Sequence, residues 1–219
     1  AARALAEQIR ELAADQLESA IADIELVEGT ARIVGTDRHV TYADLVAATA
    51  DRAKLAAVGE FTQREATYPN GTHVCEVEID PQTGVTQIVG YTIVDDFGVV
   101  VNPMLLAGQI HGGVAQGIGQ ALLEHTVYDA DGQLLTASFQ DYTMPRAADM
   151  PFFHFETRNI PSTWNALGIK GAGEAGSIGS CPAVMSAVID ALGREYGITH
   201  IDMPATPLRV WEAIGAVSG

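Results

Sequence analysis

The sequence predicts an α+β fold in which helices are mixed with antiparallel hairpins. Three observations lead to this class. Apolar residues recur at helical spacing near the N-terminus, runs rich in β-branched residues are joined by turn sequences, and strands and helices follow one another without the regular alternation that a parallel sheet requires. With 219 residues, 47% of them hydrophobic, the chain has ample apolar side chains to bury a core.

The charge balance and the cysteines narrow the classes of function. The 28 acidic residues outnumber the 12 basic ones and give a formal net charge of −16, which opposes binding to nucleic acid or to anionic lipid. Cys75 and Cys181 have neither metal-ligand spacing nor the pattern of a disulfide scaffold, so we expect a reducing, cytoplasmic setting. No apolar run approaches the roughly 20 residues of a membrane span. We therefore expect a small molecule or a protein as partner, and no membrane insertion.

Residues 1–60 are expected to form a helix, a hairpin and a second helix. The sequence lacks an initial methionine and enters a helical pattern at once, which suggests that it is part of a longer polypeptide. Residues 24–34 alternate apolar and polar side chains around a Gly-Thr turn. Thr41, with Asp44 three positions later, predicts an N-cap and a helix that continues to about Val58. The first helix, over residues 3–20, is marked by Leu5, Ile9, Leu12, Leu17 and Ile21.

Residues 61–219 are expected to form the larger part of the fold, and they begin with a linker and a long hairpin. Polar residues with a proline and a glycine predict a linker over residues 62–70, although no shift in composition marks a firm domain boundary. Two β-rich runs, residues 73–80 and 84–94, flank a Pro-Gln-Thr-Gly turn and predict an antiparallel pair of strands.

The remaining elements follow from caps and turns. Asn102 before Pro103 is typical of an N-cap followed by a proline at the first helical position, and the helix is expected to reach about His125. Further elements are expected as a hairpin around Asp131-Gly132, an extended segment over residues 152–156, a helix from Pro182 to Tyr196 and a short helix near Arg209.

A glycine-rich segment at residues 168–179 is the first candidate site. Its twelve residues hold five glycines, one lysine and one glutamate, and they precede a helix that is expected to open at about Ser180. Glycines before a helix N-terminus present bare N–H groups and can form a cradle for an anionic or polar ligand. Glu174 would then either cap the next helix or face the ligand as a general base.

A second set of glycines lies inside the helix predicted after Pro103. Each glycine there costs up to ~1 kcal/mol relative to alanine, so the set needs a reason. Close packing against another helix or strand is one reading, and a flat platform for a ligand beside a row of amides is the other. On a helical grid one stripe holds Gly108, Gly112, Ala115 and Gly119, and the next holds Gln109, Gly113, Gln116 and Gln120.

Five other residues have ordinary explanations that compete with functional ones. Asp95 and Asp96 end a strand, where such residues usually cap a turn. A histidine such as His111 is more often packed than a ligand, and Cys181 is more simply buried than reactive. Trp164 either shapes a substrate channel or belongs to the core.

Six motifs occur in an order and at spacings that one known family shares: Asp95-Asp-Phe-Gly98, Asn102-Pro103, Gly108-Gln-Ile-His-Gly-Gly-Val-Ala-Gln-Gly-Ile-Gly119, Asp141-Tyr-Thr-Met-Pro145, Lys170-Gly-Ala-Gly-Glu174 and Asp202-Met-Pro-Ala-Thr-Pro207. On these motifs the chain resembles the C-terminal part of the molybdenum-binding large subunit of the xanthine dehydrogenase and aldehyde oxidase family. The carbon monoxide dehydrogenase-like branch is the most similar. Gln116 leaves the branch open, because that branch can carry an acid there whereas the others carry glutamine.

The resemblance implies that the chain helps to bind a molybdenum cofactor, molybdopterin cytosine dinucleotide, together with upstream segments of the large subunit. The pterin's sulfurs hold the metal in this family, so no protein ligand to molybdenum is expected. By resemblance, Gly112, Gly113, Gln116 and Gly117 would touch the pterin side, and Lys170, Gly171, Ala172 and Gly173 would line the cofactor near the metal.

The resemblance also implies a reaction and partners. Glu174 matches the family's catalytic base, which accepts a proton while a small substrate is hydroxylated or oxidised with oxygen from water. Electrons would leave through 2Fe-2S clusters and FAD on partner chains or domains, and none of those cysteine patterns occurs in this sequence. The remainder of the large subunit, iron–sulfur and flavin subunits, and a homodimer of the full complex are the expected assembly.

Two other functions compete with this one. The chain could be a non-catalytic structural or subunit-contact fragment of such an enzyme, which its apolar N-terminal helix would suit. Alternatively, Gly171-Ala-Gly-Glu-Ala-Gly176 fits the pattern of a nicotinamide or flavin fingerprint. That motif should follow a strand and open a helix, but residues 161–167 make a poor strand.

Overall fold

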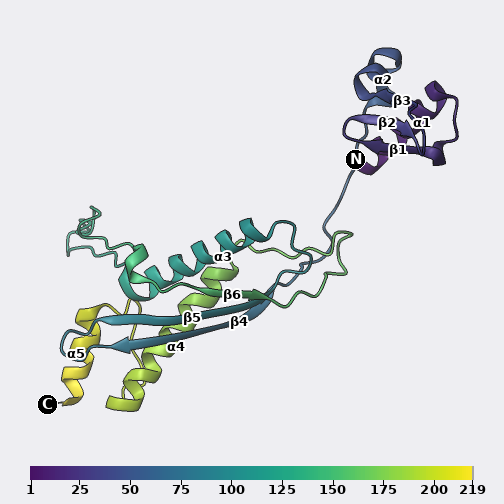
Figure 1. Cartoon of the computed structure of the whole chain (residues 1–219). Coiled ribbons are helices and arrows are strands. Elements are labelled where there is room, and N and C mark those ends of the chain that lie inside the picture. The colour runs from purple at the N-terminus through teal and green to yellow at the C-terminus, as the bar shows by residue number, and fades with distance from the viewer. Residues whose placement is uncertain (219) are drawn as a thin grey trace. The chain divides into compact units, whose positions relative to one another are not determined.

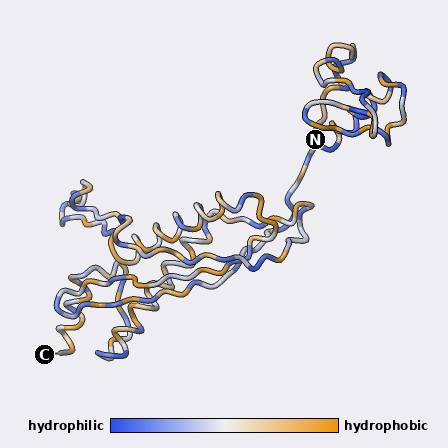
Figure 2. Tube along the Cα trace, in the orientation of Figure 1, coloured by the Kyte–Doolittle hydropathy of each residue, from blue (hydrophilic) through white to orange (hydrophobic). Residues whose placement is uncertain are grey.

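The computed structural model describes residues 1–218 of the chain (Figure 1). They divide into two compact units, the first comprising Ala1–Thr62 and the second beginning at Gln63. Both units combine helices with strands, which confirms the α+β class. Apolar and polar residues alternate along the helices and strands of each unit (Figure 2), so that each unit builds its own core.

The first unit packs one helix on a small sheet. Helix α1 (Ala2–Leu17) is followed by strands β1 (Ile24–Val27), β2 (Thr30–Ile33) and β3 (His39–Thr41), which pair antiparallel in that order. The predicted first helix and hairpin are confirmed. The sequence did not reveal β3, because three residues are too few for a period-two pattern to stand out. The core consists of Ala13, Ala14, Leu17, Ile24, Ala31, Val40 and Leu45.

Helix α2 (Tyr42–Ala48) begins where the sequence predicts and ends earlier. The Thr41 hydroxyl oxygen accepts the backbone N–H of Asp44 at 3.1 Å, as an N-cap should. The prediction that the helix reaches Val58 is wrong. Thr49 donates its hydroxyl to the Leu45 carbonyl at 2.7 Å, and the Asp51 carboxylate caps a new 3₁₀ turn over Arg52–Leu55. Polar side chains that bond to the local backbone thus break the helix.

The second unit is built on a long hairpin. Strands β4 (Asn70–Ile79) and β5 (Thr86–Asp96) pair antiparallel, as predicted. Strand β6 (His154–Thr157) overlaps the extended segment expected over residues 152–156, but it pairs with β5 in parallel, which the expectation of hairpins missed. A parallel pair needs a long crossover, and residues 97–153 with their helix provide it.

Three helices complete the second unit. Helix α3 (Pro103–Ile118) starts at the predicted cap, where the Asn102 side chain accepts the N–H of Leu105 at 3.1 Å, and it ends in a π-helical turn over Gly119–Leu123. The hairpin expected around Asp131 is reduced to one bridge between Tyr128 and Leu134. The C-terminal helices are α4 (Ala175–Tyr196) and α5 (Pro207–Ser218).

Helix α4 begins earlier than predicted, at Ala175 rather than at Ser180 or Pro182. Proline is favoured at helix starts and costs about 3 kcal/mol inside a helix, which is why the sequence pointed to Pro182. Burial of the helix's inner face against α3 and β4 offsets that cost. By length and composition alone α4 could cross a membrane, a test that core helices also pass. The residues of α4 that are buried are Gly176, Ser180, Val184, Met185, Val188 and Leu192.

Candidate functional site

The first part of the glycine-rich segment is fixed to the end of β5. Lys170 donates its backbone N–H to the Phe97 carbonyl, and Val99 donates to the Gly168 carbonyl, both at 2.9 Å. Gly98 has a positive φ of 64°, and a Cβ there would lie 2.1 Å from the Gly168 oxygen. Glycine is therefore required where the two segments meet. This pairing fixes where the chain enters the candidate site.

The side chain of Lys170 points into the fold, where it pairs with Asp96. Its Nζ lies 2.6 Å from Asp96 Oδ2, and the two side chains are only 11% and 8% exposed. Asp96 Oδ1 also accepts the backbone N–H groups of Gly98 and Ile160. Burial acts to raise the pKa of Asp96, but the hydrogen bonds from Lys170 and the two backbone groups outweigh it and hold the pKa below its usual range. Only the backbone of Lys170 is left to meet a ligand.

Glu174 occupies the N-cap position of α4 but does not cap the helix. Its side chain makes no capping hydrogen bond, and it is exposed to solvent. Its backbone carbonyl accepts the Ile178 N–H and the Ser177 hydroxyl, both at 3.0 Å. No hydrogen bond to its carboxylate occurs among residues 1–218. The alternative role foreseen for this residue, that of a cap, is thus not the one it takes.

Three glycines bring α3 and α4 into close contact. A Cβ on Gly176 would lie 2.5 Å from the Ile110 carbonyl oxygen and 2.9 Å from Gly113 Cα, and one on Gly117 would lie 1.8 Å from Ser180 Oγ. Gly113 and Gly117 are buried, so packing accounts for both. Their contact with a cofactor stays a prediction.

The opposite face of the same elements is open. Gly112 and Gln116, one turn apart on α3, are exposed, and a Cβ on Gly112 would meet nothing within 4 Å. The same holds for Gly171 and Gly173 before α4. Gln109 donates its side-chain amide to the Gly173 carbonyl at 2.7 Å and so joins the two glycine-rich segments. Ala172 is half-buried and packs against the core.

A cavity of about 330 Å³ lies beside Glu174, between the start of α4 and the strands β4 and β5. His73 and Asp95 line it together with Gly71, Gly171 and Glu174. The sequence analysis did not single out His73 and assigned Asp95 to a turn. The sequence did contain a signal for His73. It lies on the inward-facing side of β4, where the next alternate positions are occupied by Cys75, Val77 and Ile79.

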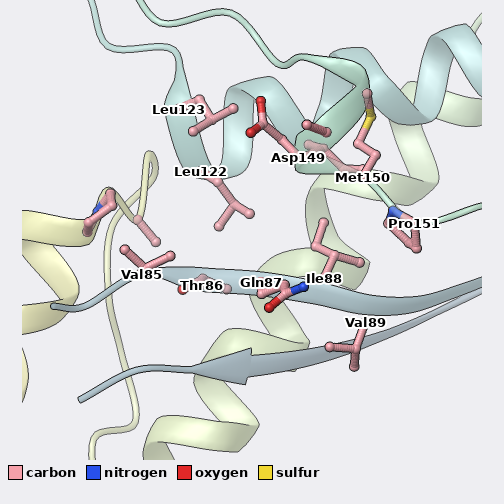
Figure 3. A pocket seen from close by; sticks show the side chains of 14 residues that line it. Val85, Thr86, Gln87, Ile88, Val89, Leu122, Leu123, Asp149, Met150 and Pro151 are labelled. Carbon is pink, nitrogen blue, oxygen red and sulfur yellow. The ribbon is translucent and has the colours of Figure 1, made fainter. Parts of the chain in front are cut away.

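A second cavity, of about 480 Å³, lies over the first half of β5 (Figure 3). Its walls are mainly apolar side chains, among them Ile88, Leu122, Leu123 and Met150. No residue that the sequence predicted for cofactor binding or catalysis lines it. The predicted residues gather instead around the start of α4.

Of the remaining candidates, His111 and the two cysteines are at least partly buried, whereas Trp164 is not. His111 stacks edge-on against Phe153 and Phe155. Burial raises the pKa of both thiols, that of Cys75 to about 12 with a contribution from Glu76, which disfavours a reactive thiolate. Trp164 is exposed. Within the described part of the chain, no three His, Cys, Asp or Glu side chains are placed to hold a metal ion.

The nicotinamide-type fingerprint has only part of its expected context. Helix α4 opens inside the Gly171–Gly176 motif, but the residue before it, Lys170, follows a single bridge between Gly98 and Ile169 rather than a strand. Gly176 is enclosed by α3. The geometry that lets a pyrophosphate approach a strand–turn–helix is therefore missing among these residues.

Comparison with known proteins adds family relationships to this geometry. The family model described as the molybdopterin cofactor-binding domain matches residues 1–151. The nicotine 6-hydroxylase large subunit of Paenarthrobacter nicotinovorans is 40% identical, over 97% of this chain and 27% of its own length. The carbon monoxide dehydrogenase large chain of Hydrogenophaga pseudoflava is 34% identical, over 98% of this chain and 27% of its own length.

Solved structures of similar proteins also match this chain. Quinoline 2-oxidoreductase from Pseudomonas putida 86 superposes with a TM-score of 0.79 at 33% identity, over 96% of this chain and 28% of that one. A copper- and molybdenum-containing carbon monoxide dehydrogenase superposes with a TM-score of 0.82 at 30% identity, over 100% of this chain and 28% of that one. The chain thus spans about a quarter of the length of the proteins that it matches.

Proposed function

Because this chain belongs to the molybdopterin-binding large-subunit family of the xanthine dehydrogenases, aldehyde oxidases and carbon monoxide dehydrogenases, we propose that it supplies the catalytic base of a molybdenum hydroxylase. The cofactor is the cytosine dinucleotide form of molybdopterin. The reaction is hydroxylation or oxidation of a small substrate with oxygen from water, and Glu174 accepts the proton.

The residues at the start of α4 fit such a cofactor. Gly171 and Gly173 have open space where a Cβ would stand, so a ligand can approach their backbone closely. Gly112 and Gln116 offer a second open face on α3, and the Gln109 bond to Gly173 fixes one segment relative to the other. When bound, the cofactor supplies the redox chemistry, and the protein's share is orientation and proton transfer.

The unpaired carboxylate of Glu174 is the observation that carries the proposal. A polar side chain at an N-cap position often accepts a hydrogen bond from the first N–H groups of its helix. Glu174 does not, although it stands at that position, so its carboxylate is free to accept a proton from a bound group. The buried Lys170–Asp96 pair holds the segment that leads to it.

Replacement of this carboxylate in the complete enzyme tests the proposal. We expect Glu174→Gln to lower kcat by about 10²- to 10⁴-fold, with the molybdenum and pterin content unchanged, because the amide keeps the shape but accepts no proton. Glu195→Gln, an exposed site near the other end of α4, is the matched control and should leave kcat unchanged. Near-normal turnover of the Glu174→Gln enzyme at full molybdenum content would remove the base assignment.

The assembly is part of the same proposal. We infer that the remainder of the large subunit completes the site and that iron–sulfur and flavin subunits accept the electrons through 2Fe-2S clusters and FAD. Relatives named as the large subunit of a hydroxylase and as the large chain or subunit gamma of dehydrogenases support an assembly of several chains. A homodimer of the full complex and a cytoplasmic location complete the proposal.

A purely structural or subunit-contact role is the second candidate. Large apolar side chains near the start of α3 and before β6 are exposed in this chain, which favours contact with further polypeptide. Metal and pterin analysis of the purified 219-residue chain separates the two roles. Stoichiometric molybdenum or pterin would contradict a purely structural one. The exposed side chains are Val101, Met104, Leu105 and Phe152.

A further inference from the structure

Strand β5 has a neighbouring strand along only part of one edge. On one side β4 pairs with it from Thr86 to Asp96, whereas on the other side β6 pairs only with Thr92–Asp95. Within the part of the chain that the structure describes, residues 86–91 therefore have no strand on the side that faces away from β4. An unpaired strand edge presents a row of backbone N–H and C=O groups that can pair with a further strand.

The register of the hairpin identifies the backbone groups that face this open edge. The Val85 carbonyl accepts the backbone N–H of Asp80 at 3.0 Å, so these two residues form a hydrogen-bonded pair. Along an antiparallel ladder such pairs alternate with pairs that are not hydrogen-bonded. Thr86 and Ile88 belong to the second kind, and their backbone groups point away from β4. Neither residue forms a backbone hydrogen bond to any other element within residues 1–218.

The cavity of about 480 Å³ lies along this edge of β5 (Figure 3). Residues 85–89 all line it, although the side chains of consecutive strand residues point to opposite faces of a sheet. A cavity that contacts all of them borders the strand at its edge. Figure 3 shows Leu122, Leu123, Asp149 and Met150 on the side of the cavity opposite β5. The cavity thus continues the row of β6 along the first half of β5.

The lining of this groove limits what can occupy it. Its side chains are apolar except for Thr86, Gln87 and Asp149, and no lysine, arginine or histidine lines it. The Asp149 carboxylate accepts the backbone N–H of Arg146 at 2.7 Å. An occupant must therefore offer apolar side chains together with a row of backbone donors and acceptors, which an extended polypeptide provides. At about 3.3 Å per residue, residues 86–90 extend for about 17 Å and can pair with about five residues.

We propose that the groove receives a short β-strand from the remainder of the large subunit, with apolar side chains on the face that packs toward the helices. The chain covers only 27% or 28% of the proteins that it matches, so most of a large subunit lies outside it. A segment of the same polypeptide is held near the groove at a high effective concentration, an advantage that a second copy or a separate protein lacks. The docking rests on the part of the proposed function that places this chain in a larger subunit, and not on Glu174.

Hydrogen exchange, read by mass spectrometry at single residues, compares the 219-residue chain with the complete enzyme. The amides of Thr86 and Ile88 should exchange at least about tenfold more slowly in the complete enzyme, because the added strand accepts their hydrogens. The amide of Gln87, which points toward β4, is the internal control and should change little. Equal rates for Thr86 and Ile88 in the two samples would overturn the proposal.

A photo-crosslinker identifies the occupant. The amino acid p-benzoylphenylalanine in place of Val85, a 48% exposed residue of the groove, should crosslink in the complete enzyme to a large-subunit segment outside these 219 residues. The same replacement at Val74, which is 51% exposed on β4 and does not line the groove, is the control and should not reach that segment. A crosslink from Val85 to a second copy of this chain or to another subunit would contradict the proposal, and so would no crosslink.

A charge in the groove should affect only the assembled subunit. Val85→Glu and Val74→Glu should alter the melting temperature of the 219-residue chain alike, because both side chains are exposed there. In the complete large subunit Val85→Glu should lower it by at least about 3 °C more than Val74→Glu does, since the added strand buries the carboxylate. Equal shifts in the complete subunit would rule the strand out. If Val85→Glu does not fold, exchange in the wild-type enzyme still decides. None of these measurements depends on turnover, so their failure leaves the assignment of Glu174 standing.

Discussion

Gly112 and Gly113 are neighbours in α3, yet one faces open space and the other is enclosed by α4. The same division runs through both glycine-rich segments. Gly176 and Gly117 let the two helices approach closely, whereas Gly171 and Gly173 leave backbone uncovered. Absence of a side chain therefore serves two purposes here. It allows close helix packing on one side and exposes a backbone surface on the other.

Lys170 and Glu174 show the same contrast among charged residues. They are four positions apart in the glycine-rich segment at residues 168–179, but Lys170 is buried against Asp96, whereas the Glu174 carboxylate is exposed and has no partner among the described residues. The inward residue stabilises the fold, and the outward one is available for chemistry. Substitutions that affect one side and spare the other test this division.

The largest expected effect on stability is at the buried ion pair. Asp96→Asn leaves the Lys170 ammonium buried beside an amide and should lower the free energy of unfolding by roughly 3–5 kcal/mol. Urea denaturation measures the loss. Asp190→Asn breaks an exposed pair with Arg194 on α4 and should cost less than ~1 kcal/mol. Equal effects of the two variants would contradict the inward role of Lys170.

The double variant Asp96→Asn with Lys170→Met sharpens this test. Removal of both charges leaves no uncompensated ion, so much of the lost stability should return. If the double variant is no more stable than Asp96→Asn, the unpaired buried charge of Lys170 is not the cause of the loss.

The pH dependence of stability follows from the same pair. The pKa of Asp96 is lower in the folded chain than its usual value, so its contribution is fully present above the usual pKa of an aspartate, about 4, and is lost as the pH falls through the folded value. Asp96→Asn should flatten this acid limb of the unfolding free energy. Urea denaturation at a series of pH values measures it, and a limb of unchanged steepness would contradict the assignment.

The next largest loss of stability is expected where α3 and α4 touch. Gly176→Ala places a Cβ 2.5 Å from the Ile110 carbonyl, where only backbone movement can relieve the overlap, and should cost about 1–3 kcal/mol. Gly193→Ala in the same helix meets only the Ile198 oxygen, at 3.4 Å. That control should be neutral or stabilising by up to ~1 kcal/mol, because alanine has the better helix propensity. Comparable losses in both would contradict close packing at Gly176.

The sequence predicted most elements because their signals are local. The cap at Asn102 and the turn before Gly84 lie within a few residues of the elements they bound. The start of α4 was missed because Pro182 gave a strong local signal, whereas the packing of Gly176 on α3 depends on residues more than sixty positions away. Parallel pairing of β6 is likewise non-local.

The part of the candidate site that lies in short sequence motifs could be predicted from the sequence. Glu174, Gly171 and Gly173 come from one short segment, and the resemblance pointed to them directly. The direction of the Lys170 side chain and the meeting of His73 with Asp95 are set by strand register and burial, which no short motif encodes. For the meeting of His73 with Asp95, the sequence offered one signal, a histidine among the apolar inward positions of β4.

The smallest effect separates the two neighbouring glycines of α3. Gly112→Ala adds a methyl group in open space and should raise the free energy of unfolding by up to ~1 kcal/mol. Gly113→Ala brings its Cβ to 3.0 Å from Gly176 Cα, so strain offsets that gain and the chain should be no more stable. In the complete enzyme, Gly112→Ala is expected to be the more harmful of the two substitutions. If the cofactor lies on the open face, Gly112→Ala should lower its molybdenum and pterin content despite greater stability, whereas Gly113→Ala should not lower that content beyond its effect on folding. A stable Gly112→Ala enzyme with full cofactor would show that this open face is not the one the cofactor uses.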